Sequence, residues 1–359
     1  MENQYSKILI APLDWGLGHA ARCIPLINMF LSQGKEIAIA SSGGALAMLK
    51  AEFPNLNFFE LPPYDVHYQY DSMALNMMLQ LPKMRAAMLK ENRALNGILM
   101  EFDADLIISD NRYGVHHPEV ASVFIGHQLA IQLPAKVSLF SKLSLKWHEH
   151  MLKPFDQIWV PDFDANPNLS GILSHGVKMK NKPFFIGPLS RFKHDDTVEE
   201  DLPLLVMISG QEPRRTQFEK QIIEQLSGWK EEMVLLRGLP AEKKEFVSPY
   251  SNLKIYNHLP SAQLEQLLRR AQRVVCRSGY SSVMDFAALH KRALYIPTSG
   301  QTEQEYLAAY LSKSGNALYT VEAATNLLDK LNQLDMIFPL KLENNRLDYL
   351  VKLALNELK

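Results

Sequence analysis

Short apolar runs alternate with longer amphipathic segments along this chain, and that alternation constrains its fold more than any other feature. The run KILIAP at Lys7–Pro12 is followed by the helix-like segment Ala20–Gln33 and then by a second apolar run, Glu36–Ala40. A strand followed by a helix and another strand is typical of a βαβ unit, whose strands pair in parallel. The pattern therefore predicts an α/β protein built on doubly wound parallel sheets.

The alternation occurs in two series that meet near Gly187–Arg191. The predicted strands of the first series are Lys7–Pro12, Glu36–Ala40, Asn57–Leu61, Asp105–Ser109, Ala121–Ile125, Gln157–Val160 and Phe184–Ile186, and those of the second are Leu204–Ser209, Met233–Arg237, Leu253–Tyr256, Arg273–Cys276 and Ala293–Pro297. The predicted helices are Ala20–Gln33, Ser72–Phe102, Thr216–Leu226, Ala262–Arg270, Ser281–Leu289, Glu303–Ser312 and Leu340–Leu358. Pro82 is the point at which the long helix over 72–102 would break, because proline removes a backbone hydrogen bond.

The length of the chain predicts more than one domain. It has 359 residues, whereas a single domain usually has about 50–250. We expect an N-terminal domain over 1–188, a C-terminal domain over 189–339, and a last helix over 340–359 that packs back on the N-terminal domain. The acidic, turn-rich stretch Asp195–Pro203 suits an exposed connection.

Composition excludes several classes of protein and predicts a compartment. Only two cysteines, Cys23 and Cys276, occur, which excludes a disulfide scaffold and favours a reducing compartment. No apolar run approaches the roughly 20 residues of a membrane span, and the polar start Met1–Ser6 lacks the apolar core of a signal peptide. The formal net charge of −1 provides no basic field for nucleic acid. We expect a cytoplasmic protein that does not bind nucleic acid.

The neutral total conceals one basic region. Nine Lys or Arg residues face only four acidic ones between Pro134 and Lys193. Within this region, Lys136–Phe155 mixes lysines with apolar side chains at helical spacing. Two interpretations stay open: a helix packed on the core with solvated lysines, or a peripheral patch that contacts the inner membrane surface and a lipid-linked acceptor.

The loop after the first predicted strand contains the leading catalytic candidate. It covers Asp14–His19 and opens a helix. Gly16 and Gly18 allow a tight turn and the close approach of a ligand to the backbone, while the helix start contributes N–H groups and a positive dipole end. Since an imidazole titrates near neutral pH, His19 suits the role of a general base. A structural or helix-capping histidine is the alternative.

Other polar residues of the first domain lie close to strand ends, where ligands of doubly wound sheets bind. Asp14 is a second catalytic candidate, which either orients His19 or contacts an acceptor hydroxyl. Arg22 either binds an anionic group or faces solvent. The predicted acceptor contacts are Gly16, Gly18, Arg22, Asp110, His127 and Gln128.

The loops of the second domain suit a nucleotide sugar. The amides of Ser209–Gln211 can hold phosphate oxygens, and the hydroxyls within Cys276–Ser282 stand at a helix N-terminus that suits a diphosphate. A carboxylate at Asp285 can accept hydrogen bonds from ribose hydroxyls, or it can complement the helix dipole. The polar loop Thr298–Glu305 suits sugar hydroxyls.

Together these segments resemble the GT-B glycosyltransferases, and within them family 28, which includes the peptidoglycan enzyme that adds N-acetylglucosamine to an undecaprenyl-linked precursor. Val274–Gly279, Asp285 and Pro297 with Glu303–Tyr306 look like that family's UDP-sugar site. The link Gly187–Arg191 is similar to its interdomain hinge. The resemblance implies two Rossmann-like, doubly wound parallel-sheet domains that face a cleft.

The resemblance also implies roles for single residues. The family has a glutamate that holds the ribose at the position of Asp285, so the aspartate is a shorter arm. Gln304 matches a glutamine that contacts the donor sugar, but Glu305 replaces the partner glutamine. His258 lies where the family holds uracil, mainly through its backbone. The predicted donor contacts are Gly210, Gln211, His258, Arg277, Ser278, Gly279, Ser281, Ser282, Asp285, Glu303, Gln304 and Glu305.

The function that the resemblance implies is inverting sugar transfer from a UDP-sugar to an acceptor hydroxyl, with a lipid-linked or cell-envelope glycan as acceptor. His19 would remove the acceptor proton, and helix N-terminal amides and hydroxyls would stabilise the leaving diphosphate. UDP-sugar is a co-substrate, and neither a cofactor nor a metal is expected. Asp103–Asp105 precedes a strand as a solvated turn, and no Cys/His spacing matches a zinc site.

Two other functions stay open. Gly16–Cys23 also resembles the UDP-sugar hydrolase of the pseudaminic acid pathway, in which water replaces the acceptor. A non-catalytic nucleotide-sugar-binding subunit that recruits a membrane partner is the third possibility, although the two-domain chain with His19 argues against it.

Overall fold

The structure is a computed structural model of the whole chain, and it describes residues 5–64, 73–130, 141–324, 327–341 and 346–358. The chain divides into two compact units. Unit 1 comprises Met1–Leu189 together with Asn344–Lys359, and unit 2 comprises Ser190–Glu343. The C-terminal segment therefore returns to the N-terminal unit.

The described part of unit 1 is built on a seven-stranded parallel sheet with the order β3-β2-β1-β4-β5-β6-β7. Its central strands are buried on both faces, which is why they read as continuous apolar runs rather than as alternating ones. The strands are β1 (Lys7–Pro12), β2 (Glu36–Ser41), β3 (Asn57–Glu60), β4 (Leu106–Asp110), β5 (Ala121–Ile125), β6 (Gln157–Val160) and β7 (Phe184–Phe185).

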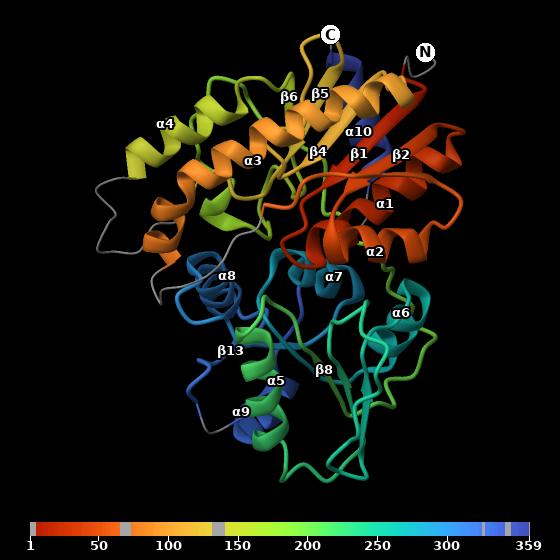
Figure 1. Cartoon of the computed structure of the whole chain (residues 1–359). Coiled ribbons are helices and arrows are strands. Elements are labelled where there is room, and N and C mark those ends of the chain that lie inside the picture. The colour runs from red at the N-terminus through yellow and green to blue at the C-terminus, as the bar shows by residue number, and fades with distance from the viewer. Residues whose placement is uncertain (1–4, 65–72, 131–140, 325–326, 342–345, 359) are drawn as a thin grey trace. The chain divides into compact units, whose positions relative to one another are not determined.

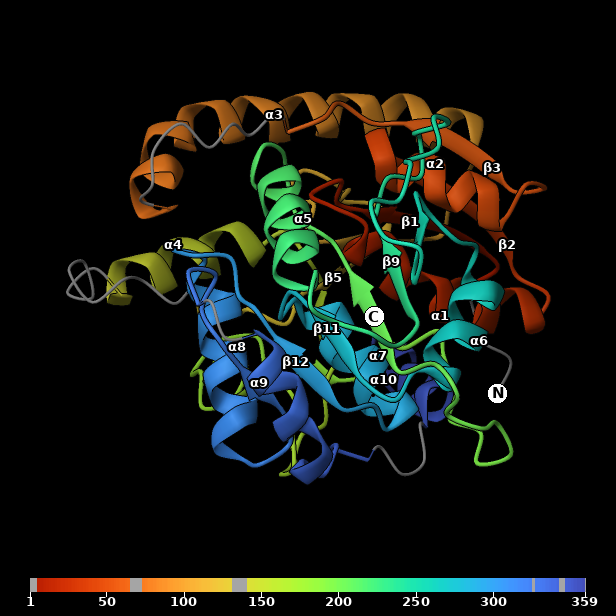
Figure 2. The same ribbon diagram turned by 90° about the horizontal axis from the view of Figure 1, so that it is seen from below.

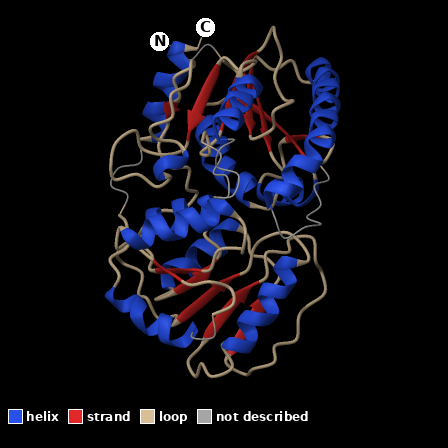
Figure 3. Cartoon of the chain, turned by 90° about the vertical axis from the view of Figure 1, so that its left-hand side faces the viewer, coloured by secondary structure: helices blue, strands red, loops and turns tan. Residues whose placement is uncertain are grey.

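Helices cover both faces of this sheet, which is drawn in red within its unit in Figure 3. They are α1 (Gly18–Ser32), α2 (Gly43–Glu52), α3 (Met73–Glu101), α4 (Ser141–Leu152) and α10 (Leu347–Glu357). Helix α10 lies among the elements of unit 1 (Figure 1), where the Gln157 side-chain amide donates to the Ala354 carbonyl at 2.9 Å. Gln33 donates to Asp348 at 2.6 Å on the same helix, so contacts from two elements hold it.

The described part of unit 2 has a six-stranded parallel sheet with the order β10-β9-β8-β11-β12-β13. The strands are β8 (Leu204–Met207), β9 (Met233–Leu236), β10 (Leu253–Tyr256), β11 (Val274–Cys276), β12 (Ala293–Tyr295) and β13 (Leu318–Tyr319). The helices of unit 2 are α5 (Arg214–Gln225), α6 (Ser261–Arg270), α7 (Tyr280–Leu289), α8 (Thr302–Lys313) and α9 (Leu327–Gln333). Each unit also has a short 3₁₀ turn: η2 (Gly171–Leu173) in unit 1 and η3 (Leu334–Met336) in unit 2.

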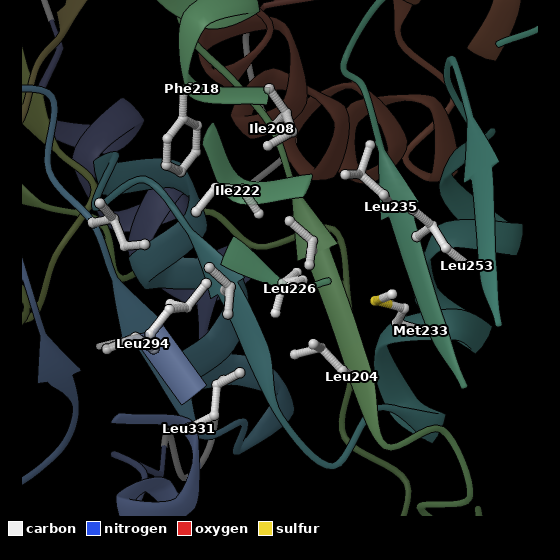
Figure 4. Close-up of a cluster of buried hydrophobic side chains, with 14 of the residues drawn as sticks. Leu204, Ile208, Phe218, Ile222, Leu226, Met233, Leu235, Leu253, Leu294 and Leu331 are labelled. Carbon is white, nitrogen blue, oxygen red and sulfur yellow. The ribbon is translucent and has the colours of Figure 1, made fainter. Parts of the chain in front are cut away.

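One apolar cluster joins the sheet of unit 2 to its covering helices. Phe218 and Ile222 on α5 face Leu204 on β8 and Leu294 on β12, and Leu331 on α9 closes the cluster (Figure 4). All five side chains are almost completely buried. Because each buried side chain of this size stabilises the fold by about 1.5–3 kcal/mol, this cluster fixes the strand ends from which the loops of unit 2 emerge.

The predicted fold class is confirmed, with two parallel-sheet α/β units. Most element bounds lie close to those expected, but the last helix, predicted over Leu340–Leu358, is α10 over Leu347–Glu357. Helix α3, the long orange helix in Figure 2, runs through Pro82 without a break, contrary to the expectation. The sequence analysis missed α2, because it begins with two glycines, and glycine is a poor helix former. It also missed β13, because two residues give no readable period.

Candidate active site

The strand order of each sheet reverses at one point. In unit 1, β1 pairs with β2 on one side and with β4 on the other. In unit 2, β8 pairs with β9 and with β11. Ligands of doubly wound sheets bind where the loops leave the sheet at such a point. The loops after β1, β4, β8 and β11 are therefore the places to look for chemistry, and they contain many of the predicted site residues.

In unit 1, the loop after β1 turns into α1 at Gly16, whose φ of +81° favours glycine. His19 then stands on the first turn of α1, with its Nδ1 2.7 Å from Oδ1 of Asp110, the last residue of β4. A carboxylate only accepts hydrogen bonds, so Nδ1 carries the proton and donates. The other nitrogen, Nε2, keeps its lone pair and is the atom that can take up a proton.

Asp110 is completely buried and receives more than one donor from α1. Arg22 donates through Nε to Asp110 Oδ2 at 2.5 Å and through a terminal nitrogen to Oδ1, a bidentate pair. The Cys23 thiol lies 3.5 Å from Oδ2 of the same carboxylate. Positions 19, 22 and 23 share one face of a helix by their spacing of three and four residues, so one carboxylate holds that whole face.

These contacts change the titration of both members of the His19–Asp110 pair. Burial alone would raise the pKa of Asp110, but Arg22 and then His19 outweigh it and hold that pKa below its usual range. Burial is also the main influence on His19 and lowers its pKa; Asp110 raises it, and Arg22 lowers it again. His19 is therefore neutral at physiological pH, as a general base must be.

Three further acceptor-side candidates lie close to this pair in sequence or space. His127 follows β5 and is buried, and its Nδ1 lies 3.0 Å from a terminal nitrogen of Arg22. Because arginine only donates, Nδ1 of His127 is the acceptor. Gln128 and Gly18 are partly exposed. Arg22 itself is 2% exposed, so the alternative that it faces solvent is wrong.

Asp14 does not have the orienting role that the sequence analysis considered for it. Its Oδ2 accepts the Ser42 hydroxyl at 2.6 Å, at the residue before α2, and its Oδ1 lies 3.5 Å from Arg112. These contacts tie the loop after β1 to the start of α2, where a carboxylate complements the helix dipole. Asp110 is the carboxylate that contacts His19. The alternative contact of Asp14 with an acceptor hydroxyl stays a prediction.

A buried network next to this loop was missed. Arg112 is fully buried and donates to Glu91 at 2.6 Å, to the Pro12 carbonyl at 2.8 Å and to the Ser42 hydroxyl at 2.8 Å. Tyr64 donates to Glu91 at 2.7 Å. Arg112 thus joins the ends of β1 and β2 to α3. Its position two residues after a buried strand was the available signal, but nothing in the sequence marks Glu91 as its partner.

In unit 2, the helices that follow β8, β11 and β12 differ at their N-termini. Glu212 accepts the Thr216 amide at 3.2 Å and so occupies the start of α5, and α8 has Glu303 and Glu305 in its first turn. Helix α7 begins after Gly279 and has no acidic residue in its first turn. Of these three helices, α7 is therefore the one whose positive dipole end favours the binding of an anion.

Two predicted donor contacts point inward instead. Arg277 is 1% exposed; it donates to the Ile296 carbonyl at 2.9 Å, pairs with Glu322 and lies over the Phe218 ring at 3.6 Å. Ser278 is fully buried, and its hydroxyl donates to the Gln304 carbonyl at 2.7 Å. These side chains hold the loop after β11 in place. The geometry gives neither side chain a surface for a ligand, which corrects the prediction for both.

Asp285 lies on α7 and is 8% exposed. The Ser190 hydroxyl, at the first residue of unit 2, donates to its Oδ1 at 2.8 Å. Burial raises the pKa of Asp285 to about 6, although Arg191 and the Ser190 hydrogen bond oppose the rise. The carboxylate therefore gains or loses its charge close to neutral pH.

The other donor candidates lie around these loops at different exposures. Gln304 is buried and its side-chain oxygen accepts the Thr298 amide at 2.8 Å. Glu305 is exposed and accepts the Gly300 amide at 2.8 Å, so both side chains shape the loop before α8. The remaining candidates are partly or fully exposed: Gly210, Gln211, His258, Gly279, Ser281, Ser282 and Glu303.

Among the described residues there is no group of three or more His, Cys, Asp or Glu side chains that could hold a metal ion. Asp105 accepts the backbone amide and hydroxyl of Ser6 at 2.7 and 2.8 Å, a structural use of that carboxylate. No described helix has the length and apolarity needed to cross a membrane.

The basic stretch over 136–155 falls partly outside the described residues, which exclude 131–140. In its described part, Leu152 and Phe155 belong to an apolar cluster of unit 1, while Lys146 and Lys153 are exposed. These are the features of a core-packed helix with solvated lysines. Contact with a membrane stays untested.

The known proteins to which this chain is similar are described as glycosyltransferases. Residues 214–345 match the glycosyltransferase family 28 C-terminal domain. An uncharacterized glycosyltransferase of Methanosarcina acetivorans is 24% identical over 327 residues, covering 86% of this chain and 84% of the relative. Another, of Methanosarcina mazei, is 22% identical over 329 residues with the same coverage.

Solved glycosyltransferases share the fold. The kitacinnamycin glycosyltransferase has a TM-score of 0.62 at 15% identity, covering 98% of this chain and 94% of that one. The spinosyn rhamnosyltransferase in complex with thymidine diphosphate has a TM-score of 0.61 at 14% identity, with 98% and 95% covered.

The two parallel-sheet units and these matches define the class: the chain has the GT-B fold. Within that fold, residues 214–345 match the glycosyltransferase family 28 C-terminal domain, and the whole chain is similar to proteins described as glycosyltransferases.

Proposed function

We propose that this glycosyltransferase moves a sugar from a UDP-sugar to an acceptor hydroxyl with inversion at the anomeric carbon. The observation that carries the proposal is the His19–Asp110 pair at the reversal point of the unit 1 sheet. It combines a neutral imidazole, a fixed tautomer and an Nε2 lone pair, which are the requirements for deprotonating a hydroxyl. His19 and Asp110 take the catalytic roles, and Gly16, Gly18, His127 and Gln128 remain candidates for acceptor contacts.

The reaction needs one displacement. The acceptor oxygen forms a bond to the anomeric carbon while its proton passes to Nε2 of His19. The bond between that carbon and the diphosphate oxygen breaks, and its electron pair leaves with the diphosphate. Because the acceptor enters opposite the leaving group, the configuration inverts. Asp110 stays ionised and stabilises the imidazolium that forms.

Unit 2 supplies the support for a nucleoside diphosphate donor. The N-terminus of α7 lacks a carboxylate in its first turn, and Ser281 and Ser282 are partly exposed there. The spinosyn rhamnosyltransferase of similar fold binds thymidine diphosphate, so a nucleoside diphosphate is the ligand class of that relative. The resemblance to family 28 favours uridine as the base.

For the acceptor, we propose a lipid-linked or cell-envelope glycan that a cytoplasmic enzyme meets at the inner membrane surface. The support is the run of exposed lysines Lys146, Lys153, Lys178, Lys180 and Lys182 in unit 1, since such side chains attract anionic lipid headgroups.

The test is incubation of the purified protein with UDP-, TDP- and ADP-sugars, with lipid extract, with soluble oligosaccharides or without acceptor. Expected results are release of UDP that depends on the lipid extract, and an inverted linkage by NMR. Release of UDP with free sugar in every arm would instead indicate a UDP-sugar hydrolase. UDP binding without turnover would indicate a binding subunit. Absence of binding to UDP and to every UDP-sugar would overturn the donor.

A further inference from the structure

Asp110 has two side-chain partners on α1, the imidazole of His19 and the guanidinium of Arg22. Oδ1 receives a hydrogen bond from Nδ1 of His19, and the guanidinium of Arg22 contacts both carboxylate oxygens. Both Arg22 and Asp110 are buried, with 2% and 0% of their side chains exposed. The negative charge that would otherwise act on His19 alone is thus shared with a permanent positive charge.

The physical consequence concerns the strength of the base. A carboxylate that pairs only with an imidazole favours the protonated imidazolium and makes the histidine more basic. A guanidinium on the same carboxylate offsets part of that field and adds its own repulsion toward a proton on His19. The described titratable groups that act on His19 are Asp110 from β4, Arg22 from α1 and His127 after β5. Arg22 is the permanent cation among them.

We propose that Arg22 is a positioning residue that sets the basicity of His19 by sharing its partner carboxylate, Asp110. The inference rests on the proposed function in that His19 is taken as the base. Arg22 also contacts Nδ1 of His127 at 3.0 Å, so its guanidinium is held in place from two sides.

The primary test measures His19 itself and requires no activity. Imidazole NMR of the full chain gives the titration midpoint of His19 in wild type, Arg22→Gln and Arg22→Lys. The expected result is a midpoint about one pH unit higher in Arg22→Gln. Arg22→Lys, which keeps the charge, should stay within a few tenths of wild type. Arg93→Gln, the same change at an exposed site on α3, is the matched control and should leave the midpoint in place.

A midpoint that is unchanged or lower in folded Arg22→Gln would overturn the inference. Where Arg22→Gln does not fold, the wild-type midpoint can only contradict the inference, because burial also lowers the pKa of His19 below the ordinary histidine value of about 6.5. A wild-type midpoint above that value would overturn the role given to Arg22.

The pH dependence of turnover separates this inference from the proposed function. With His19 as the base, the acid limb of the profile should move upward in Arg22→Gln by the same amount as the NMR midpoint, so turnover falls about tenfold on that limb. A raised NMR midpoint with an unmoved acid limb would support the tuning of His19 and reject His19 as the base. A rise in acceptor KM with no movement of either midpoint would make Arg22 an acceptor contact and overturn the inference.

Discussion

The two units have the same sheet plan but place different chemistry at the point where the strand order reverses. In unit 1 this point holds the Asp110 carboxylate, which is in direct contact with both His19 and Arg22. In unit 2 the corresponding loops contain the N-terminus of α7, which has hydroxyl groups and no carboxylate in its first turn. The first arrangement suits proton transfer and the second suits an anion, so the same topology presents different chemistry in the two units.

The comparison extends to the loops after β4 and β11, which are equivalent strands of the two sheets. Each loop is pinned by a fully buried arginine that pairs with a glutamate: Arg112 with Glu91, and Arg277 with Glu322. Glu91 is completely buried, whereas the Glu322 side chain is 23% exposed. The glutamate of unit 1 is therefore shielded from water, while the glutamate of unit 2 keeps some contact with water.

The largest expected effect is at His19. We predict that His19→Ala lowers turnover by about 10³-fold, because a positioned general base contributes about 10²–10⁴-fold. Nucleotide affinity should stay at the wild-type value, since the nucleotide site is assigned to unit 2. Steady-state kinetics and calorimetric titration with UDP measure the two quantities on the same preparation.

This result would sharpen the division of roles between the units. Turnover that stays within a factor of three of wild type would remove His19 from the mechanism. A loss of UDP affinity in the same variant would contradict the division of roles between the units, because it would make His19 part of the nucleotide site.

The next effect concerns the two buried arginines. We predict that Arg112→Leu destabilises unit 1 by about 3 kcal/mol, the lower end of the cost of leaving one member of a buried pair alone. Arg277→Leu should destabilise unit 2 by less, because Glu322 can be hydrated. Hydrogen exchange followed by mass spectrometry reports the stability of each unit separately within the full chain.

The double variant Arg112→Leu with Glu91→Leu is the control for this prediction. It removes both charges, so much of the lost stability should return. Equal losses in Arg112→Leu and Arg277→Leu would show that exposure of the glutamate does not decide the cost, and the contrast drawn between the two loops would fail.

The alternation of apolar runs was enough to predict the fold because buried parallel strands must be apolar along their whole length, as β1 and β4 are. Elements whose form depends on their neighbours were harder. Helix α2 begins with Gly43 and Gly44, and its start is held by Ser42, Asp14 and Arg112, contacts that only the folded chain brings together.

The candidate site also has residues that the local sequence predicted and contacts that depend on distant parts of the chain. His19 and Asp110 were both found, because each follows a strand and the strand-end rule collects them. For the carboxylate that orients His19, the sequence analysis considered Asp14, which is near His19 in sequence, whereas the contact is made by Asp110, 91 residues away. Arg277 and Ser278 were read as ligand contacts because their position in the loop is right. Whether a side chain turns outward or inward depends on Glu322 and Gln304, which the local sequence does not contain.

The smallest expected effect is at Asp285, where unit 2 has its own titratable group. Its folded pKa, about 6, is raised above the ordinary value of 3.8, so its contribution to stability is fully present below the ordinary value and is lost as the pH rises through 6. If the ionised carboxylate accepts ribose hydroxyls, UDP affinity must rise over the same interval. The stability of unit 2 and its affinity should therefore change in opposite directions between pH 5 and 7.

Asp285→Asn should remove both dependences. We predict about a tenfold loss of UDP affinity at pH 7, the lower end of the value of a hydrogen bond to a charged group. Affinity and unit 2 stability should then be flat from pH 5 to 7, by calorimetry and hydrogen exchange. Asp329→Asn, at an exposed position on α9, is the matched control and should retain both slopes. Wild-type affinity in Asp285→Asn at pH 7 would remove Asp285 from nucleotide binding and leave it a structural role through Ser190.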